Sequence, residues 1–140
     1  MNQPITPDDW GPHGWKFLHY ITLGYPNNPT IDEKNKYKNF FISLQHVLPC
    51  SVCSKHYGEN IEKYSLHEAL NNQESLMKWL IDVHNDVNQS KGKKIYDYDE
   101  ALALYTNPSL FPDYVQSCFK LFVLLILLFF IYKIKCFYII

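Results

Sequence analysis

Apolar residues repeat with helical spacing along the first three quarters of the chain. The clearest example covers residues 37–48, where apolar side chains recur three and four positions apart and so form one face of a helix. Thr30 and Glu33 match a capping box, which predicts that this helix begins just before that stripe. Two further stripes, over residues 15–22 and 76–87, predict two more helices.

Prolines and glycines separate these predicted helices. Pro12 lies near the expected start of the first helix, and Pro49 breaks the second helix and suits the first turn of a third. Gly92 is expected to close the helix over residues 76–87, and residues 99–105 predict a short last helix. No segment alternates polar and apolar residues, so the expected fold is all-α, a four-helix bundle with a short fifth helix.

The last 28 residues differ in composition from the rest of the chain. Residues 121–132 are apolar apart from a final tyrosine, and residues 117–138 form a stretch of 22 residues with a lysine near each end. Because a helix needs roughly 20 residues to cross the hydrocarbon layer, we expect a C-terminal transmembrane helix. Residues 113–140 are therefore predicted to be linker and membrane anchor, after a folded domain over residues 1–112. A buried C-terminal helix of a soluble bundle is the alternative.

The N-terminus and the charge pattern narrow the expected location and partners. The first nine residues have neither a basic start nor an apolar stretch, so we expect no signal peptide and a folded domain in the cytosol. All 13 basic residues are Lys, and the net charge is −1. Since neither Arg side chains nor an excess of positive charge is available, nucleic-acid binding is not expected.

Candidate chemistry concentrates at Cys50 and Cys53. Two thiols three residues apart at a helix start face the same way, and the helix dipole favours a thiolate, most strongly at the first. In a cytosolic chain such a pair indicates redox chemistry or metal binding. A zinc site would take His56 as a third ligand but lacks a fourth, and Ser54 excludes a c-type haem motif. Two buried cysteines without a chemical role are a further alternative.

Aromatic, imidazole and carboxamide side chains lie on the same helix face in two other predicted helices. Trp15 and His19 lie four residues apart in one predicted helix, and His84 and Asn88 in another, with Asn85 beside them. Taken singly, such residues are more often satisfied members of a core. Together they offer rings on which a planar cofactor could stack and amides for its edge. A dithiol beside such an electron acceptor would make an oxidase.

Four sequence blocks carry a resemblance to a known family. They are WGPHGWKFLH at 10–19, YP at 25–26, PCSVCSKHY at 49–57 and HNDVNQSKGK at 84–93. Over residues 10 to 105 the chain resembles the FAD-linked sulfhydryl oxidases of the Erv/ALR type, and it looks most like the compact members encoded by large DNA viruses. Four blocks in the family's order are more specific than a lone C-x-x-C.

This resemblance implies a fold, a cofactor and a reaction. Members are four-helix bundles with a short fifth helix that bind FAD noncovalently, usually form homodimers, oxidise thiols and reduce O2 to H2O2. By this resemblance Cys53 lies against the isoalloxazine ring of FAD, and Cys50 exchanges disulfides with a dithiol-containing protein substrate. No metal site is implied. The positions that match FAD contacts in the family are Gly11, Trp15, His19, His56, His84, Asn85, Val87, Asn88, Lys93 and Tyr96.

The chain also departs from the family's pattern. Cellular relatives carry a structural cysteine pair that would align with Ile81 and Tyr98, so packing is expected to hold the fifth helix here. The remaining cysteines, Cys118 and Cys136, lie at the two ends of the predicted anchor, so we expect direct oxidation of the substrate by the C-x-x-C pair. The anchor would place the enzyme on a membrane, that of the host or the virion if the chain is viral. A tail-anchored zinc-binding or scaffold protein is the alternative function, and a flavin-free dithiol exchanger comes third.

Overall fold

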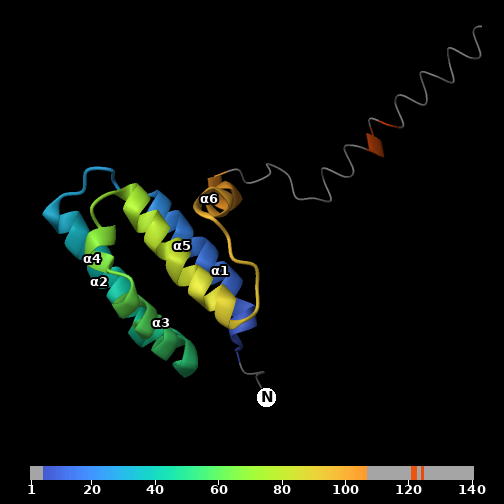
Figure 1. Cartoon of the computed structure of the whole chain (residues 1–140), viewed down its shortest axis with the longest axis horizontal. Coiled ribbons are helices and arrows are strands. Elements are labelled where there is room, and N and C mark those ends of the chain that lie inside the picture. Colours follow the sequence, from blue (N-terminus) through green and yellow to red (C-terminus); the bar gives the residue numbers. More distant parts are fainter. Residues whose placement is uncertain (1–4, 107–120, 123, 125–140) are drawn as a thin grey trace, which may run out of the picture. The chain divides into compact units, whose positions relative to one another are not determined.

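The computed structural model describes residues 5–106 together with residues 121, 122 and 124. Six helices and no strand occur between residues 5 and 106 (Figure 1). The helices are α1 (Pro7–Leu23), α2 (Ile31–Val47), α3 (Ser51–Lys63), α4 (Leu66–Ala69), α5 (Gln73–Ser90) and α6 (Tyr98–Thr106). Four are long, α4 is a single turn, and α6 is the short fifth helix that the sequence predicts. The all-α prediction is therefore confirmed for this part of the chain.

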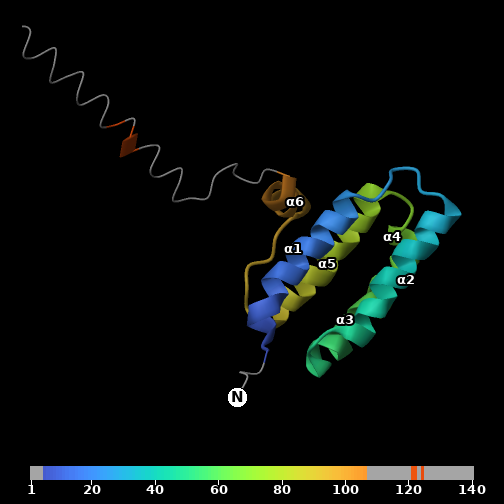
Figure 2. The same ribbon diagram turned by 180° about the vertical axis from the view of Figure 1, so that it is seen from behind.

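The long helices lie in two adjacent pairs. α1 runs beside α5, and α2 runs beside α3, as both views show (Figures 1 and 2). α4 packs against α5, and α3 also contacts α5, so the two pairs are joined at the α3–α5 contact. The site described below lies where the N-terminal parts of α1 and α3 meet the C-terminal end of α5.

Side-chain caps set the start of most helices. The capping box predicted for α2 is present, because Thr30 accepts a bond from the Glu33 N–H at 3.2 Å and the Glu33 carboxylate accepts one from the Thr30 N–H at 2.8 Å. Asn72 caps α5, where its Oδ1 accepts from the Ser75 N–H at 2.8 Å. Gly92 has a φ of 63°, a left-handed conformation that glycine adopts without strain, and it directs the chain away from the end of α5.

Two predicted helix starts were wrong. Pro12 lies inside α1, which begins five residues earlier after Thr6, because Thr6 and Asp9 form another capping box there. Pro49 precedes α3 instead of lying in its first turn, and Cys50 is the N-cap residue. The second correction matters for function, because it places one cysteine at the boundary of α3 and the other in its first turn.

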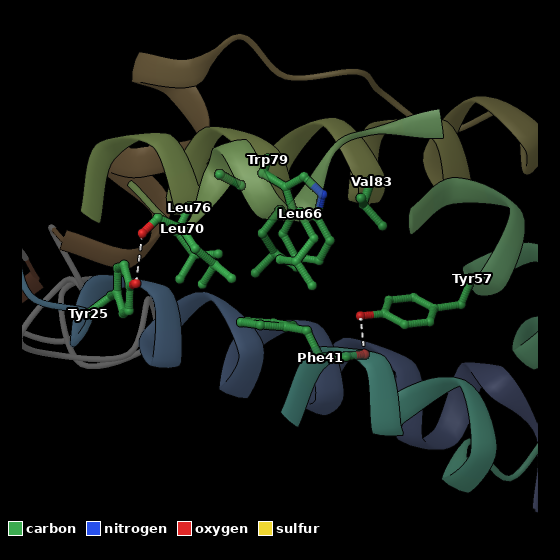
Figure 3. Packing of buried hydrophobic residues seen from close by; sticks show 10 residues of the cluster. Tyr25, Phe41, Tyr57, Leu66, Leu70, Leu76, Trp79 and Val83 are labelled. Atoms are coloured by element: carbon green, nitrogen blue, oxygen red, sulfur yellow. Dashed lines mark hydrogen bonds between the residues drawn. The ribbon is translucent and has the colours of Figure 1, made fainter. Parts of the chain in front are cut away.

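The hydrophobic core fills the space between the helix pairs (Figure 3). Phe41 of α2 lies edge-on to Trp79 of α5, with ring centroids 5.1 Å apart, and both side chains are buried. Two tyrosines bring hydroxyl groups into this core and donate them to backbone carbonyls, Tyr57 to Phe41 at 2.9 Å and Tyr25 to Leu70 at 2.9 Å. These two buried hydroxyl groups are thereby satisfied, and α3 is joined to α2 through Tyr57.

The chain divides into two compact units, residues 1–105 and residues 106–140. The predicted anchor, residues 113–140, lies outside the described residues except for three apolar positions, and it remains a prediction. Among the residues that the structure describes, no helix is both long and apolar enough to span a membrane.

Candidate active site

Cys50 and Cys53 form a disulfide at the start of α3, with their Cα atoms 5.2 Å apart. As N-cap residue, Cys50 has extended backbone, and its Sγ accepts a hydrogen bond from the Cys53 N–H at 3.2 Å. Both side chains are partly exposed. In the described part of the chain no group of three or more His, Cys, Asp or Glu is placed to hold a metal ion. A disulfide that opens and closes is the chemistry that this arrangement offers.

A pocket of about 580 Å³ lies directly beside the disulfide. Both cysteines line it, and its walls come from α1, α2, α3 and the end of α5. Most of the lining is apolar or aromatic, which suits a flat ring system. The aromatic and aliphatic residues that surround it include Trp10, Trp15, Leu18, Phe40, Leu44 and Leu48.

A second pocket of about 320 Å³ adjoins the first. Pro7, Gly11, Trp15, Val87 and Lys91 line both pockets, so the two share a wall and lie side by side. The smaller pocket has a different character, because three lysines of the segment after α5 line it. These are Lys91, Lys93 and Lys94. Lys91 pairs with Asp8, which also lines this pocket, at 3.6 Å, and Lys94 pairs with Glu100 at 3.0 Å. Lys93 has no ion pair among the described residues, so it is the cation that best suits a phosphate-bearing group.

Stacked rings form the wall between α1 and α5. The Trp15 and His84 rings lie nearly parallel with centroids 4.0 Å apart, and His19 Nε2 lies 3.1 Å from His84 Nδ1. The ring of Tyr105 of α6 stacks on that of His19 with centroids 4.2 Å apart. Burial lowers the pKa of His19 to about 3, with a smaller contribution from His84. Burial also lowers the pKa of His84 to about 4, assisted by the positive charge of Lys93. Both imidazoles are therefore neutral at physiological pH.

Two polar groups on the pocket walls are left for a ligand. Trp10 lines the larger pocket, and its Nε1 atom is buried without a hydrogen-bond partner among the described residues. Asn88 is 8% exposed and lines the smaller pocket, and no bond from its carboxamide to another described residue is found. An unpaired buried donor predicts an acceptor on the group that fills the site. The carbonyl groups of an isoalloxazine ring and the nitrogens of an adenine meet that requirement, so these residues fit FAD.

The structure brings together most of the residues predicted to contact FAD. Three line both pockets, and His56 lines the larger one. The others that line the smaller pocket are His84, Asn88, Lys93 and Tyr96. His19 and Asn85 line neither pocket. His19 lies behind His84, and the Asn85 carboxamide is bonded to the backbone of Tyr96.

The lining residues that sequence reasoning missed include Trp10, Lys91, Lys94 and Tyr105. The Thr6–Asp9 capping box was a readable signal for Trp10, since a helix that begins at Pro7 includes it. No spacing rule connects Tyr105 to His19, because the two residues are far apart in the chain and meet only when α6 packs on α1.

A hydrogen bond joins α6 to α5 beside Ile81 and Tyr98, the two positions that the resemblance aligns with a cysteine pair of cellular relatives. The Tyr98 hydroxyl donates to the carboxylate of Asp82, whose two oxygens lie 3.0 and 3.1 Å away. Ile81, the other aligned position, is buried with 2% of its surface exposed. The predicted replacement of a disulfide by packing is thus joined by a polar contact between α5 and α6.

Comparisons with known proteins agree with this geometry. The profile of the Erv1/Alr family matches residues 12–106. The "Probable FAD-linked sulfhydryl oxidase R368" of Acanthamoeba polyphaga mimivirus is 46% identical over 99 residues, which cover 70% of this chain and 69% of that protein. The "FAD-linked sulfhydryl oxidase ERV1" of Arabidopsis thaliana is 36% identical over 93 residues, which cover 66% of this chain and 48% of that protein. The chain thus spans about half the length of the plant relative.

Solved structures show the same fold. The yeast Erv1 core superposes with a TM-score of 0.69 at 26% identity, over 75% of this chain and 87% of that one. The FAD-binding domain of Erv1 from Saccharomyces cerevisiae superposes with a TM-score of 0.64 at 27% identity, over 68% and 89% of the two chains. The helices that form the pockets are therefore arranged as in a domain named for FAD binding.

Proposed function

The chain belongs to the Erv1/Alr family, and from that premise we propose that it makes disulfide bonds in protein substrates through Cys50 and Cys53. It is a FAD-linked sulfhydryl oxidase, a class named in its relatives and consistent with its fold. The observation that carries the proposal is the disulfide on the wall of a pocket of about 580 Å³. The same pocket supplies rings and an unpaired indole N–H, and the adjoining pocket supplies lysines.

Cys50 is the sulfur that a substrate thiolate attacks. Cys50 lies at the boundary of α3 and is partly exposed. Attack of the substrate thiolate on the Cys50 sulfur releases the Cys53 thiolate and leaves a mixed disulfide between Cys50 and the substrate. A second substrate thiolate then attacks the substrate sulfur of that bond and releases Cys50. The substrate leaves as a disulfide, and two electrons and two protons have been given up by its thiols. The Cys50 thiolate is stabilised by the Cys53 N–H and the N-terminal end of α3.

The remaining residues hold the cofactor and keep it close to the dithiol. Trp10, Trp15 and Asn88 would bind its rings and their edges, and Lys93 in the smaller pocket would bind its phosphates. When bound, FAD supplies the oxidant that accepts the electrons of the dithiol and transfers them to O2, giving H2O2. The neutral His19–His84 pair keeps a flat, uncharged wall beside this site.

Two further proposals concern the assembled enzyme. We propose that the enzyme is a homodimer, as the resemblance implies. We propose that residues 113–140 anchor it to a membrane, with the catalytic domain on the cytosolic side. The support for the anchor is the apolar stretch over residues 117–138.

Substitution of each active-site cysteine tests the proposed function. The full chain should purify yellow and oxidise a reduced protein dithiol with consumption of O2. Cys50→Ser and Cys53→Ser should each abolish this activity, because neither variant can form the intramolecular disulfide, and each should retain bound FAD. Oxygen consumption and flavin absorbance measure the two properties.

The matched control makes the same chemical change elsewhere in the chain. The Cys118→Ser/Cys136→Ser double variant should retain activity, since direct oxidation needs only the C-x-x-C pair. Near-normal turnover in either active-site variant would contradict the proposal. A colourless protein with stoichiometric zinc would instead support the scaffold alternative.

A further inference from the structure

The side chain of Asn85 forms hydrogen bonds to the protein's own backbone. Its Nδ2 donates to the backbone oxygen of Tyr96 at 2.8 Å, and its Oδ1 accepts from the backbone N–H of the same residue at 3.1 Å. The carboxamide thus bonds both the N–H and the C=O of Tyr96, as the backbone of a neighbouring β-strand would. Asn85 lines neither pocket, although His84 and Asn88 on the same helix line the smaller one.

The segment held in this way is part of the cofactor site. Residues 91–97 connect α5 to α6 without regular structure. The chain turns away from α5 at Gly92. The next residue, Lys93, donates its backbone N–H to the Asn88 carbonyl at 2.8 Å. The segment contributes Lys91, Lys93, Lys94 and Tyr96 to the smaller pocket. Beyond Lys93, the two bonds to Asn85 tie its backbone to α5.

We propose that Asn85 is a positioning residue, which promotes FAD binding by fixing the segment over residues 91–97 instead of touching the cofactor. This inference rests on the proposed function. It reassigns a position that the family resemblance placed among the FAD contacts. A conformationally free segment would have to be ordered when FAD binds, and that loss of entropy would weaken binding. By ordering the segment beforehand, Asn85 removes this cost.

Amide hydrogen exchange on the full chain without FAD tests the inference directly. The Tyr96 amide should be protected in the unmodified protein, and Asn85→Ala should raise its exchange rate about tenfold, since two hydrogen bonds are lost. FAD should bind the variant about tenfold more weakly. Gln89→Ala removes the same carboxamide from an exposed position on α5 and should change neither quantity. If Asn85 acted only by touching FAD, Asn85→Ala would leave the exchange rate of the Tyr96 amide unchanged in the protein without FAD, and that result would overturn the inference.

A double-variant cycle supplies the second measurement. If Asn85 acts through the segment, Lys93→Ala and Asn85→Ala together should weaken FAD binding by much less than the product of their separate effects. Independent, multiplicative effects would overturn the inference. If Asn85→Ala does not fold, an unprotected Tyr96 amide in the unmodified protein would overturn it equally. Failure of the full chain to bind any FAD would refute the proposed function, while the exchange of Tyr96 would still report on the Asn85 contact.

Discussion

His19 and His84 form a hydrogen-bonded pair that the fold keeps uncharged. Only one proton can lie between His19 Nε2 and His84 Nδ1, so one ring donates and the other accepts. Protonation of both rings would put two positive charges side by side under Trp15 and near Lys93. Burial is the larger cause of the low pKa at each site. The pair therefore contributes stability only while it stays neutral.

This neutrality makes the free energy of unfolding depend on pH. Histidines of the unfolded chain titrate near pH 6.5, whereas the folded pair titrates at about 3 and about 4, so below pH 6.5 the unfolded state binds more protons. Stability should be greatest above that pH and fall as the pH drops, by up to about 1.4 kcal/mol per pH unit for each histidine. Urea unfolding of the full chain at a fixed FAD concentration, at about pH 7 and about pH 5, measures the decline.

His19→Gln isolates the contribution of the pair, because the amide can still bond His84 but does not titrate. The variant should lose less stability than the unmodified chain between the two pH values. His67→Gln, an exposed position on α4, is the matched control and should leave the decline unchanged. An identical pH dependence in the His19 variant and the unmodified chain would show that the pair is not responsible.

At the level of the helices, capping residues determine where the long elements begin. α5 carries much of the site, and it begins at Asn72, whose side chain satisfies the Ser75 N–H at the first turn. Because α5 contacts α1, α3 and α4, its N-terminal end matters to the whole bundle. A defect at this cap should therefore appear in global unfolding and not only in local fraying.

Asn72→Ala should lower the free energy of unfolding by about 1 kcal/mol, the usual cost of losing an N-cap. Asn72→Ser should restore most of it, because a hydroxyl can also accept from the Ser75 N–H. The adjacent Asn71→Ala deletes the same side chain from an exposed position, where the only described side-chain hydrogen bond is that from Lys34 at 3.4 Å. Thermal or urea unfolding should show little change in that control. Equal losses in the two Ala variants would argue against the capping role.

Local patterns predicted the elements better than their boundaries. The apolar stripes and the capping box at Thr30 correctly indicated α2 and α5, since these signals lie within one helix. Pro12 misled the prediction of α1, because a proline inside a helix costs one backbone bond and contacts of the rest of the helix can offset it. The Trp15–His19 face was readable from spacing. The Tyr105 stack and the Asn85–Tyr96 pairing were not, because they form only when α6 folds back over α1 and α5.

For the whole molecule, the catalytic unit and the predicted anchor make separable contributions. Every described residue that lines the two pockets lies within residues 1–105, which form one compact unit. A chain that ends at Pro112 should therefore bind FAD and oxidise a small dithiol at a rate close to that of the full chain. The full chain should co-sediment with lipid vesicles, and the shortened chain should stay in solution.

One substitution controls for chain length in this comparison. Leu127→Asp keeps all 140 residues and places a charge near the middle of the predicted span, so it should weaken the association with vesicles. Its dithiol oxidase activity should not change. Equal sedimentation of all three chains would contradict the anchor, and loss of FAD from the shortened chain would show that residues beyond Pro112 contribute to the site.

The position of the disulfide has a consequence for how the enzyme tolerates its own turnover. Cys50 and Cys53 belong to the same helix start, and no other disulfide is found among the described residues. The contacts that join one helix to another in this part of the chain are noncovalent, among them the Tyr57–Phe41 and Tyr98–Asp82 hydrogen bonds. In the proposed mechanism, the bond that breaks and re-forms in each cycle therefore links no two helices. By that mechanism, a strongly reducing environment should convert the pair to two thiols and stop oxidation, while the helix packing around it stays intact.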